Sequence, residues 1–439
     1  MANILIVVTA LGDYLYLGSL LKREAVRHLQ TSAHSSVNIL LIGSTTRCGL
    51  KVQNPAYGLC SQGVTGINSD IDMIIHLNTA ARTVSLLSIP RDLFVPNAPV
   101  EAANKIDAAL VEGPSQLVAA IEQDFGIPIN HYVELNFDTF ASVVDALGGV
   151  RMYFPVPVFD AESGLNIARP GCYRLDGYHA LQVVRARHLQ IQPSPLNTNH
   201  STWPQEPLSD LARIRRTHEF LRVLAAKVAA RGLGDPLTDQ RIAASVLPHL
   251  TVDSGFSEST MVSLASQFAR TVIANVLQET FPVIGLNAPN GYQYKGYSYG
   301  SIVFPVQPTG YNLVDQIFGV SMQMSPFSDR ALPGPSTFRI SVENGSGLVH
   351  QARNIAANLS SKGFRVIAAG DRTPTGPLTE TLVWYGGAPP PAHANWENPA
   401  LEAAQSVMSQ LEGPAIMGYN PSLVTPGALV TVQTGTVWA

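Results

Sequence analysis

Residues 71–89 read IDMIIHLNTAARTVSLLSI, and this stretch decides the fold. Two apolar runs of strand length, Ile71–Leu77 and Thr83–Ile89, are separated by the short segment Asn78–Arg82. Apolar runs of this length with a polar connection between them are typical of buried strands joined as a hairpin. We therefore expect two antiparallel neighbours in a central sheet.

Strands and helices alternate outward from this hairpin. Apolar runs predict further strands at Val37–Ile42, Tyr132–Phe137 and Val150–Val158. Periodic apolar residues that follow a capping side chain predict helices beginning at Ser115, Asp138, Asp176 and Ser209. This alternation is typical of an α/β fold, in which a mixed central sheet is sandwiched by helices.

The chain of 439 residues is long enough for more than one domain. We expect a large domain over residues 37–322. The proline-rich segment Met324–Ser336 predicts a linker over residues 323–336. Beyond it, residues 337–439 alternate strands with helices at Val349–Leu359 and Leu401–Leu411, which predicts a small C-terminal α/β domain.

The N-terminal segment and two cysteines bear on export. Residues 4–21 are mostly apolar, with Asp13 in the middle, and basic residues follow. This length is close to the minimum for a bilayer span, so we expect residues 1–30 to be a membrane anchor or its remnant rather than an amphipathic helix. Cys48 and Cys60 would form a disulfide in an exported protein, or stay as two thiols otherwise.

Arginine is concentrated in three segments of a chain that has few charges. Charged residues are only 14% of the sequence and the net charge is −4, which argues against a nucleic-acid binder. The arginine segments are Ser88–Asp92, Val183–His188 and Asp210–Arg216. Arginine is planar, always charged and suited to gripping phosphate oxygens in pairs. Together the segments predict one cavity for a phosphorylated ligand, although each alone could be a set of surface salt bridges.

The spacing within these segments supports convergence. Arg185 and Arg187 would point to the same side of an extended segment. Asp210 and Arg213 would share a helix face, with Arg216 three residues further on. Lys105 adds a cation in Asn-Lys-Ile-Asp. Asp70 and Asp72 flank the start of a strand, and neighbouring carboxylates with a diphosphate make a magnesium site.

The arginine segments and the motifs around them resemble those of the LytR-CpsA-Psr family. The resemblance covers about residues 37–230. The motifs that carry it, in chain order, are Asn38-Ile-Leu-Leu-Ile-Gly43, Ser69-Asp70, Leu86-Leu-Ser-Ile-Pro-Arg-Asp92, Asn104-Lys105-Ile106, Gly126-Ile-Pro-Ile-Asn-His-Tyr132, Val144-Asp-Ala-Leu-Gly-Gly-Val150, Leu175-Asp-Gly177, Val184-Arg-Ala-Arg-His188 and Asp210-Leu-Ala-Arg213. Residues 338–439, with Val342-Glu-Asn-Gly345 and Gly363-Phe-Arg-Val366, resemble the LytR-type C-terminal domain of actinobacterial members.

The resemblance implies an enzyme of the cell envelope. Such proteins are anchored at the extracytoplasmic face of the cell membrane and are metal-dependent transferases. They join a glycopolymer carried on polyprenyl diphosphate to peptidoglycan through a phosphodiester. The lipid lies in an apolar tunnel and Mg²⁺ lies on the diphosphate. The actinobacterial wording of the motifs points to arabinogalactan as the polymer.

The resemblance and the residue patterns together give a set of site residues. The expected catalytic residues are Arg91, Asp92, Arg185, Arg187, Asp210 and Arg213. The expected diphosphate-binding residues are Arg47, Arg91, Lys105, Arg185, Arg187, Arg213 and Arg216. The expected metal ligands are Asp70 and Asp72. Either Asp92 or Asp210 would accept the proton of the attacking hydroxyl or orient an arginine.

The sequence also departs from the family pattern at three positions. Where the family has the loop Gly-x-Asp-x-Arg, this chain has Thr45 in place of the aspartate. Asn68 replaces an arginine of the family, and Thr217 replaces a glutamine. Asp72 could replace the lost carboxylate. The departures keep two alternatives open, a polyprenyl-phosphate-binding regulatory protein and a polyprenyl-diphosphate pyrophosphatase. The loop Gln192–Pro207 would be either a lid or a surface insertion.

Overall fold

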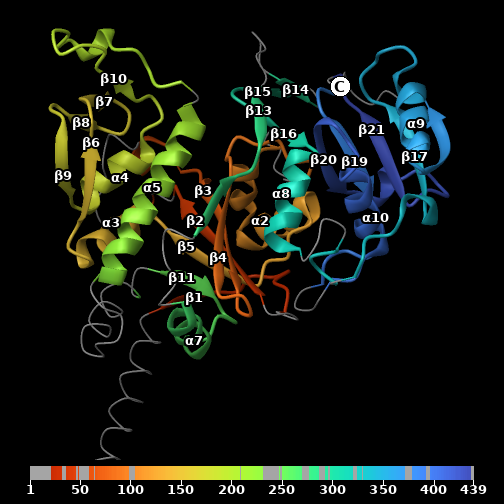
Figure 1. Ribbon diagram of the computed structural model, residues 1–439, viewed down its shortest axis with the longest axis horizontal. Helices are drawn as coiled ribbons and strands as arrows, with labels where there is room; N and C mark the ends of the chain where they lie inside the picture. The colour runs from red at the N-terminus through yellow and green to blue at the C-terminus, as the bar shows by residue number, and fades with distance from the viewer. Residues whose placement is uncertain are drawn as a thin grey trace, which may run out of the picture.

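The computed structural model describes residues 21–31, 36–45, 48, 59–63, 65–97, 104–207, 209–230, 247, 250–268, 276–285, 292–294, 297–319, 324–328, 330–370, 378–391 and 396–436 (Figure 1). Residues 1–20, which hold most of the expected anchor, and Arg47 lie outside this set. Within the described residues, no helix combines the length and the apolar composition needed to cross a bilayer.

The fold is mixed α/β, as expected, and the predicted hairpin is confirmed at its centre. β3 (Ser69–Asn78) and β4 (Thr83–Ile89) pair antiparallel, with Asp72 opposite Ile89 and Asn78 opposite Thr83. β2 (Ser36–Ser44) pairs antiparallel with the other side of β3. Across the described residues this sheet has seven strands in the order β1-β11-β5-β2-β3-β4-β12. Its outer members are β1 (Lys22–Glu24), β11 (Thr251–Asp253), β5 (His131–Leu135) and β12 (Leu277–Thr280).

Helices cover both faces of this sheet, because the side chains of a strand alternate between faces. Leu40, Ile42 and Ile74 pack with the apolar side of α2 (Pro114–Phe125). Leu41 and Ile71 face the opposite layer, α3 (Phe137–Ala146), α4 (Gly177–Arg185) and α5 (Ser209–Ala230). Figure 1 shows these three helices on one side of the strands and α2 on the other.

Three local expectations differ from the structure. Gly113, not Ser115, precedes the first turn of α2, and Asn136, not Asp138, caps α3 through a capping box with Thr139. The strand expected at Val150–Val158 is two strands, β6 (Val150–Phe154) and β7 (Val158–Asp160), which pair in different sheets. The prolines of this segment explain the break, because a proline cannot donate to a ladder hydrogen bond.

Small elements complete this half of the molecule. β6 pairs with β9 (Gly171–Leu175), while β7 lies between β8 (Leu165–Ile167) and β10 (Gln190–Ile191). α7 (Glu258–Phe268) packs below β2 and β11. The short helices are η2 (Cys60–Gln62), η3 (Ile106–Glu112) and η4 (His200–Thr202). Cys48 and Cys60 are joined by a disulfide, and Cys172 is an exposed thiol.

A second sheet holds the C-terminal residues and, in the part of the chain that the structure describes, has the strand order β13-β16-β20-β19-β21-β17-β18. α9 (Gln351–Ser361) and α10 (Pro399–Met408) fall near the predicted helices Val349–Leu359 and Leu401–Leu411. As expected, strands alternate with them: β17 (Arg339–Asn344), β18 (Arg365–Gly370), β19 (Thr381–Tyr385) and β21 (Val430–Thr434). β20 (Gly413–Tyr419) is a strand that the sequence reading missed. η7 (Pro335–Thr337) and η8 (Pro421–Leu423) are short turns at its margins.

Strands from before the expected linker extend this second sheet. β16 (Val303–Gln307) pairs antiparallel with β20, and β13 (Val283–Gly285) pairs with β16. α8 (Thr309–Phe318) follows β16, and the hairpin β14 (Tyr292–Tyr294) and β15 (Tyr297–Tyr299) packs nearby. The domain limits expected from sequence stay a prediction, but the two sequence segments share one sheet and one apolar core.

A buried carboxyl group lies at this junction. Glu380 is fully buried and accepts hydrogen bonds from the Tyr292 hydroxyl at 3.1 and 3.0 Å. Burial raises the pKa of Glu380 to about 8, although the hydrogen bond from Tyr292 opposes this rise. Between its ordinary pKa of 4.5 and 8, the folded protein therefore holds a proton that the unfolded chain releases, and stability falls as pH rises.

We expect Glu380→Gln to remove this pH dependence. An amide keeps the shape of the side chain and cannot ionise, so the variant should gain on the native protein as the pH rises from about 5 to about 8. The gain in free energy of unfolding should be a few kcal/mol at most, since one pKa unit is about 1.4 kcal/mol. Urea denaturation at several pH values measures it, and parallel curves for the two proteins would contradict the assignment.

Candidate functional site

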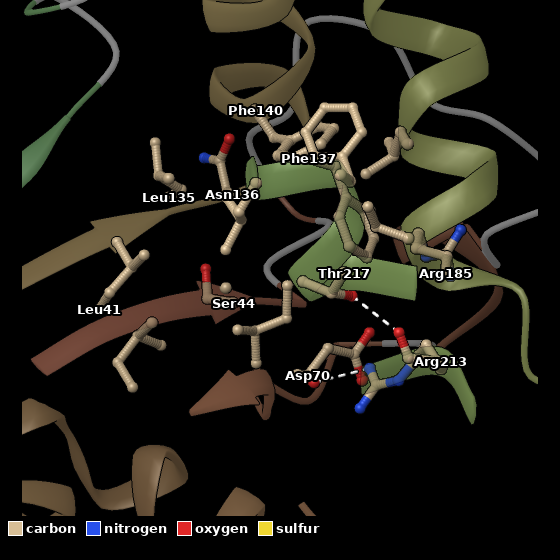
Figure 2. A pocket seen from close by; sticks show the side chains of 17 residues that line it. Leu41, Ser44, Asp70, Leu135, Asn136, Phe137, Phe140, Arg185, Arg213 and Thr217 are labelled. Carbon is tan, nitrogen blue, oxygen red and sulfur yellow. Dashed lines mark hydrogen bonds between the residues drawn. The ribbon is translucent and has the colours of Figure 1, made fainter. Parts of the chain in front are cut away.

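A pocket lies between the central sheet and the helices α3, α4 and α5 (Figure 2). Its walls are apolar, with Leu41 and Ile71 from the sheet and a cluster of aromatic and aliphatic side chains from the helices. The helical side chains are Phe137, Phe140, Leu181, Val184, Phe220 and Leu221. Asp70, Arg185 and Arg213 line the same pocket. The cavity therefore joins an apolar interior to a charged end.

Arg91 is the centre of a cluster of charged side chains that adjoins this end of the pocket through Asp70. It follows β4 and Pro90, and its guanidinium forms an ion pair with Asp70 on β3. Its Nη2 lies 3.1 Å from Asp107 Oδ2 on η3, and its Nε lies 3.8 Å from Asp92 Oδ1. Burial opposes the charge, but these carboxylates raise the pKa of Arg91. The guanidinium is thus held from several sides in one orientation.

Asp92 holds two further cations. Its Oδ1 accepts a hydrogen bond from Lys105 Nζ at 3.0 Å, and its Oδ2 accepts one from Arg187 Nη2 at 2.9 Å. Arg187 Nε also lies 3.4 Å from Asp210 Oδ1. Residues from the first and second arginine segments therefore meet here, as the sequence predicted.

The third arginine segment reaches the same place through α5. Arg213 is 3% exposed, and its Nη1 donates to the backbone oxygen of Asp70 at 2.6 Å, a bond drawn in Figure 2. Its Nη2 lies 3.0 Å from Asp210 Oδ1, one turn earlier on the helix. The expected i, i+3 pair is thus present, and it fixes Arg213 against the end of β3.

Arg185 reaches the pocket by a different route from the one expected. It is the last residue of α4, so the segment is not extended there. Its guanidinium carbon lies 4.4 Å from the centre of the Phe137 ring, a cation–π contact inside the pocket. Figure 2 shows Arg185 and Arg213 on the same side of the pocket. The convergence holds even though the reasoning from strand geometry was wrong.

Arg216 is engaged elsewhere. Its guanidinium bonds Glu206 and the backbone oxygen of Ala186. It therefore ties the segment expected as a lid or insertion to the second arginine segment. The segment Gln192–Pro207 also has internal hydrogen bonds: Trp203 Nε1 and Gln192 Nε2 donate to the backbone oxygen of Asn197 at 3.0 and 2.8 Å.

The carboxylates of the site differ in protonation. Burial opposes the ionisation of Asp70, but Arg91, Arg213, Arg185 and Arg187 together lower its pKa. Asp72, two residues along the strand, has its pKa raised to about 8 by burial and by the charge of Asp107.

Asp107 itself was missed by the sequence reading. Burial raises its pKa to about 6, while the Arg91 charge lowers it. A signal for Asp107 is present in the motif Asn-Lys-Ile-Asp, because Asp107 comes two residues after the expected diphosphate-binding Lys105.

The carboxylates meet part of what a magnesium ion needs. Asp70 and Asp72 lie at i, i+2 on β3 and border one small cavity. Within the described part of the chain, neither oxygen of Asp72 accepts a hydrogen bond of good geometry, although the Ser69 side chain lies close enough to lower its pKa. No three His, Cys, Asp or Glu residues of that part gather as a metal site. The donor set therefore fits the metal when a bound diphosphate supplies the remaining oxygens.

All three departures from the family pattern have clear contacts. Thr45 Oγ1 accepts a hydrogen bond from Asn68 N at 2.9 Å, and Thr45 N donates to Asn68 O at 2.8 Å. These residues therefore pin the end of β2 beside the start of β3. Thr217 lines the pocket and donates to Arg213 O at 3.0 Å (Figure 2).

Comparison with known proteins gives consistent matches. A LytR_cpsA_psr family model matches residues 18–303, and a model described as LytR cell envelope-related transcriptional attenuator matches residues 337–438. The chain is 30% identical over 263 residues to the probable cell wall biosynthesis protein LcpB of Corynebacterium glutamicum, covering 59% of this chain and 58% of LcpB.

Two more distant proteins extend the comparison. The polyisoprenyl-teichoic acid–peptidoglycan teichoic acid transferase TagU of Bacillus anthracis is 28% identical over 232 residues, covering 52% of this chain and 65% of TagU. The solved LytR-Csp2A-Psr enzyme from Actinomyces oris has a TM-score of 0.52 and 23% identity, covering 69% of this chain and 97% of that chain. The likeness to this structure agrees with the fold described above.

Proposed function

Because the chain belongs to the LytR-CpsA-Psr family, we propose that it is a transferase that joins a polyprenyl-diphosphate-linked cell-wall glycopolymer to peptidoglycan. One observation carries the proposal. A single pocket has an apolar interior made by α3, α4 and α5 and a charged end lined by Asp70, Arg185 and Arg213, and Asp70 is paired there with Arg91 of the first arginine segment. A lipid tail and a diphosphate are the two halves of such a donor.

In the proposed reaction, a sugar hydroxyl of peptidoglycan attacks the phosphorus nearest the glycan. A new P–O bond forms, the bond to the bridging oxygen breaks, and polyprenyl phosphate leaves with the electron pair. Negative charge grows on the phosphate oxygens and on the leaving oxygen. Arg91, Arg185, Arg187 and Arg213 would neutralise it, since preorganised cations in a site shielded from water stabilise such charge strongly.

The contacts favour Asp210 over Asp92 as the acceptor of the hydroxyl proton. Asp92 uses one oxygen for Lys105 and the other for Arg187, so its role would be to orient these cations. Asp210 contacts Arg213 and Arg187 through Oδ1. Within the described residues both of its oxygens are buried and have no hydrogen-bond partner, so Asp210 could accept a proton.

Asp70 would hold Mg²⁺, with Asp72 as a second ligand once it has lost its proton. Bound there, the ion would offset part of the diphosphate charge. We further propose that the polymer is arabinogalactan and that the protein works at the extracytoplasmic face of the cell membrane. The likeness to a Corynebacterium cell wall biosynthesis protein supports the first point, and the Cys48–Cys60 disulfide supports the second.

The test is a transfer assay with the purified full chain, a polyprenyl-diphosphate-linked glycan and peptidoglycan. We expect glycan to become linked to peptidoglycan in the presence of Mg²⁺ and polyprenyl phosphate to be released in equal amount. A chelator should lower the rate by more than tenfold, in the range of effects for lost charge stabilisation of about 3 kcal/mol.

Three results would contradict parts of the proposal. Release of polyprenyl phosphate without transfer would indicate a pyrophosphatase. Tight binding of the donor without turnover would indicate a regulatory protein, for which the Thr45 and Thr217 departures are the structural motive. Full activity in the chelator would show that Asp70 and Asp72 need no metal.

A further inference from the structure

The C-terminal region is in direct contact with the segment that carries Asp92 and Lys105. Asn97 lies at the far end of this segment and forms a reciprocal pair with Tyr419, the last residue of β20. Asn97 Nδ2 donates to Tyr419 O at 3.0 Å, and Tyr419 N donates to Asn97 Oδ1 at 2.7 Å. The side-chain amide therefore pairs with the backbone of β20 as a neighbouring strand would.

Asn97 is fixed from a second direction by α2. Its backbone N–H donates to Asp124 Oδ2 at 3.1 Å, and its carbonyl accepts from Gln116 Nε2 at 3.2 Å. Next to it, Pro96 packs against Gly418, where an added Cβ would lie only 2.9 Å from Pro96 Cγ. Such close packing leaves the segment little room to move.

From Asn97 the chain runs back to the site through buried residues, and a second stretch returns beside it. We call residues 92–97 together with the returning residues 104–107 the ribbon. Leu93, Phe94 and Val95 are fully buried. Phe94 N donates to Val303 O at 2.9 Å, and Val303 N donates to Asp92 O at 3.0 Å, which binds the ribbon to the start of β16.

The returning chain is bound in the same way. Val95 N donates to Asn104 O at 2.8 Å and Ile106 N donates to Leu93 O at 3.0 Å. Lys105 and Asp107 are on this returning chain. One stretch of the ribbon thus connects the contact with β20 to Asp92. The other carries Lys105, which pairs with Asp92, and Asp107, which pairs with Arg91.

We infer that the C-terminal domain is a brace for the active site, with Asn97 as the positioning residue that transmits its support to Asp92 and Lys105. The inference rests on the proposed function for the roles of those two side chains. A small shift of positioned groups can reduce a rate greatly, and a displacement of 1 Å can cost about a hundredfold. The pairing of β16 with β20 adds to the brace, because Val303 of β16 and Tyr419 of β20 are both hydrogen-bonded to the ribbon.

The test compares Asn97→Ala with Tyr385→Phe in the full chain. Tyr385 lies on β19 at the same interface, where its hydroxyl donates to Gln123 O of α2 at 2.9 Å. That bond is not part of the ribbon, so Tyr385→Phe removes one interface hydrogen bond outside it, whereas Asn97→Ala removes two within it. Tm should fall by about 1–2 °C in Tyr385→Phe and by about twice as much in Asn97→Ala, since a chain of 439 residues has a large entropy of unfolding.

Only Asn97→Ala should loosen the ribbon. We expect backbone amide exchange at Phe94, Val95 and Ile106 to speed up by about tenfold or more, because opening then requires fewer broken contacts. We also expect kcat/KM for transfer to fall by roughly tenfold or more. Tyr385→Phe should leave both close to native.

The outcomes separate the brace from the proposed function. If the native protein has no transfer activity, the proposed function fails, and the exchange rates alone decide the brace. Equal exchange and equal kcat/KM in the two variants would overturn the inference. If Asn97→Ala does not fold, Asn97→Ser, which leaves a smaller void and also loses the reciprocal pair, is measured in its place.

Discussion

Arg185→Ala is expected to lower kcat/KM for transfer by roughly a hundredfold to a thousandfold while the protein keeps its fold. Loss of one preorganised charge at a developing oxyanion has an effect of this size. Arg185 suits this test because its guanidinium lies over the Phe137 ring, inside the pocket and beside the expected diphosphate. Its removal leaves the ion pairs of Arg91, Asp92 and Asp210 in place.

The matched control is Arg222→Ala. Arg222 lies on the same layer of helices, in α5, and forms an exposed pair with Glu219 at 2.7 Å. An exposed pair of this kind contributes little, so both Tm and kcat/KM should stay close to native. Initial rates over a range of donor concentrations, with thermal unfolding alongside, measure the effect. A variant at Arg185 with native kcat/KM would remove this residue from the catalytic set.

Arg91→Ala is expected to lower the free energy of unfolding by about 3–5 kcal/mol, because it leaves buried carboxylates without their cation. Asp70 and Asp107 both contact the Arg91 guanidinium. The loss should depend on pH. Without Arg91, the pKa of Asp107 rises further and the pKa of Asp70 is lowered less, so the variant binds protons that the native protein does not.

The sign of this dependence follows from linkage. The deficit relative to the native protein should be largest near pH 8 and should shrink toward pH 5, because protonation relieves the unpaired charges. Asp107, whose pKa is about 6 in the native protein, should contribute most to the change. Adding Asp107→Asn to Arg91→Ala should therefore restore part of the stability at high pH.

Denaturant unfolding at several pH values measures both effects. Arg151→Ala, on the exposed side of β6, is the control for loss of an arginine without a buried carboxylate partner, and we expect little change. A pH-independent deficit in Arg91→Ala would mean that its cost comes from lost packing. In that case the carboxylates would not be the source of the instability.

Much of the fold followed from apolar patterning. The strand β3 and its hairpin with β4 were predicted almost to the residue, because two runs of buried residues and a short polar connection leave few alternatives. β20 was missed because its sequence, GPAIMGY, contains two glycines and a proline, which are uncommon in strands. Tertiary packing against β16, β19 and Pro96 decides its conformation instead.

The sequence predicted which residues gather at the candidate site, but not the contacts that each of them makes. Motif order identified Arg91, Asp92, Arg187 and Arg213, which the structure brings together. Spacing could not show that Arg185 ends a helix or that Arg216 turns toward Glu206. Those outcomes depend on where α4 stops and on contacts between residues far apart in the sequence, which local patterns do not encode.

The sheet shared by β16 and β20 also has a consequence for how the chain can be divided. A protein cut after residue 322, the expected end of the large domain, would keep β16 but lose β20, and would leave the backbone donors and acceptors of β16 bare on one side. An unprotected edge strand is a template for pairing with other chains, and so for aggregation. The two family matches end and begin at residues 303 and 337, but the interval between them is therefore an unsuitable place to divide the chain.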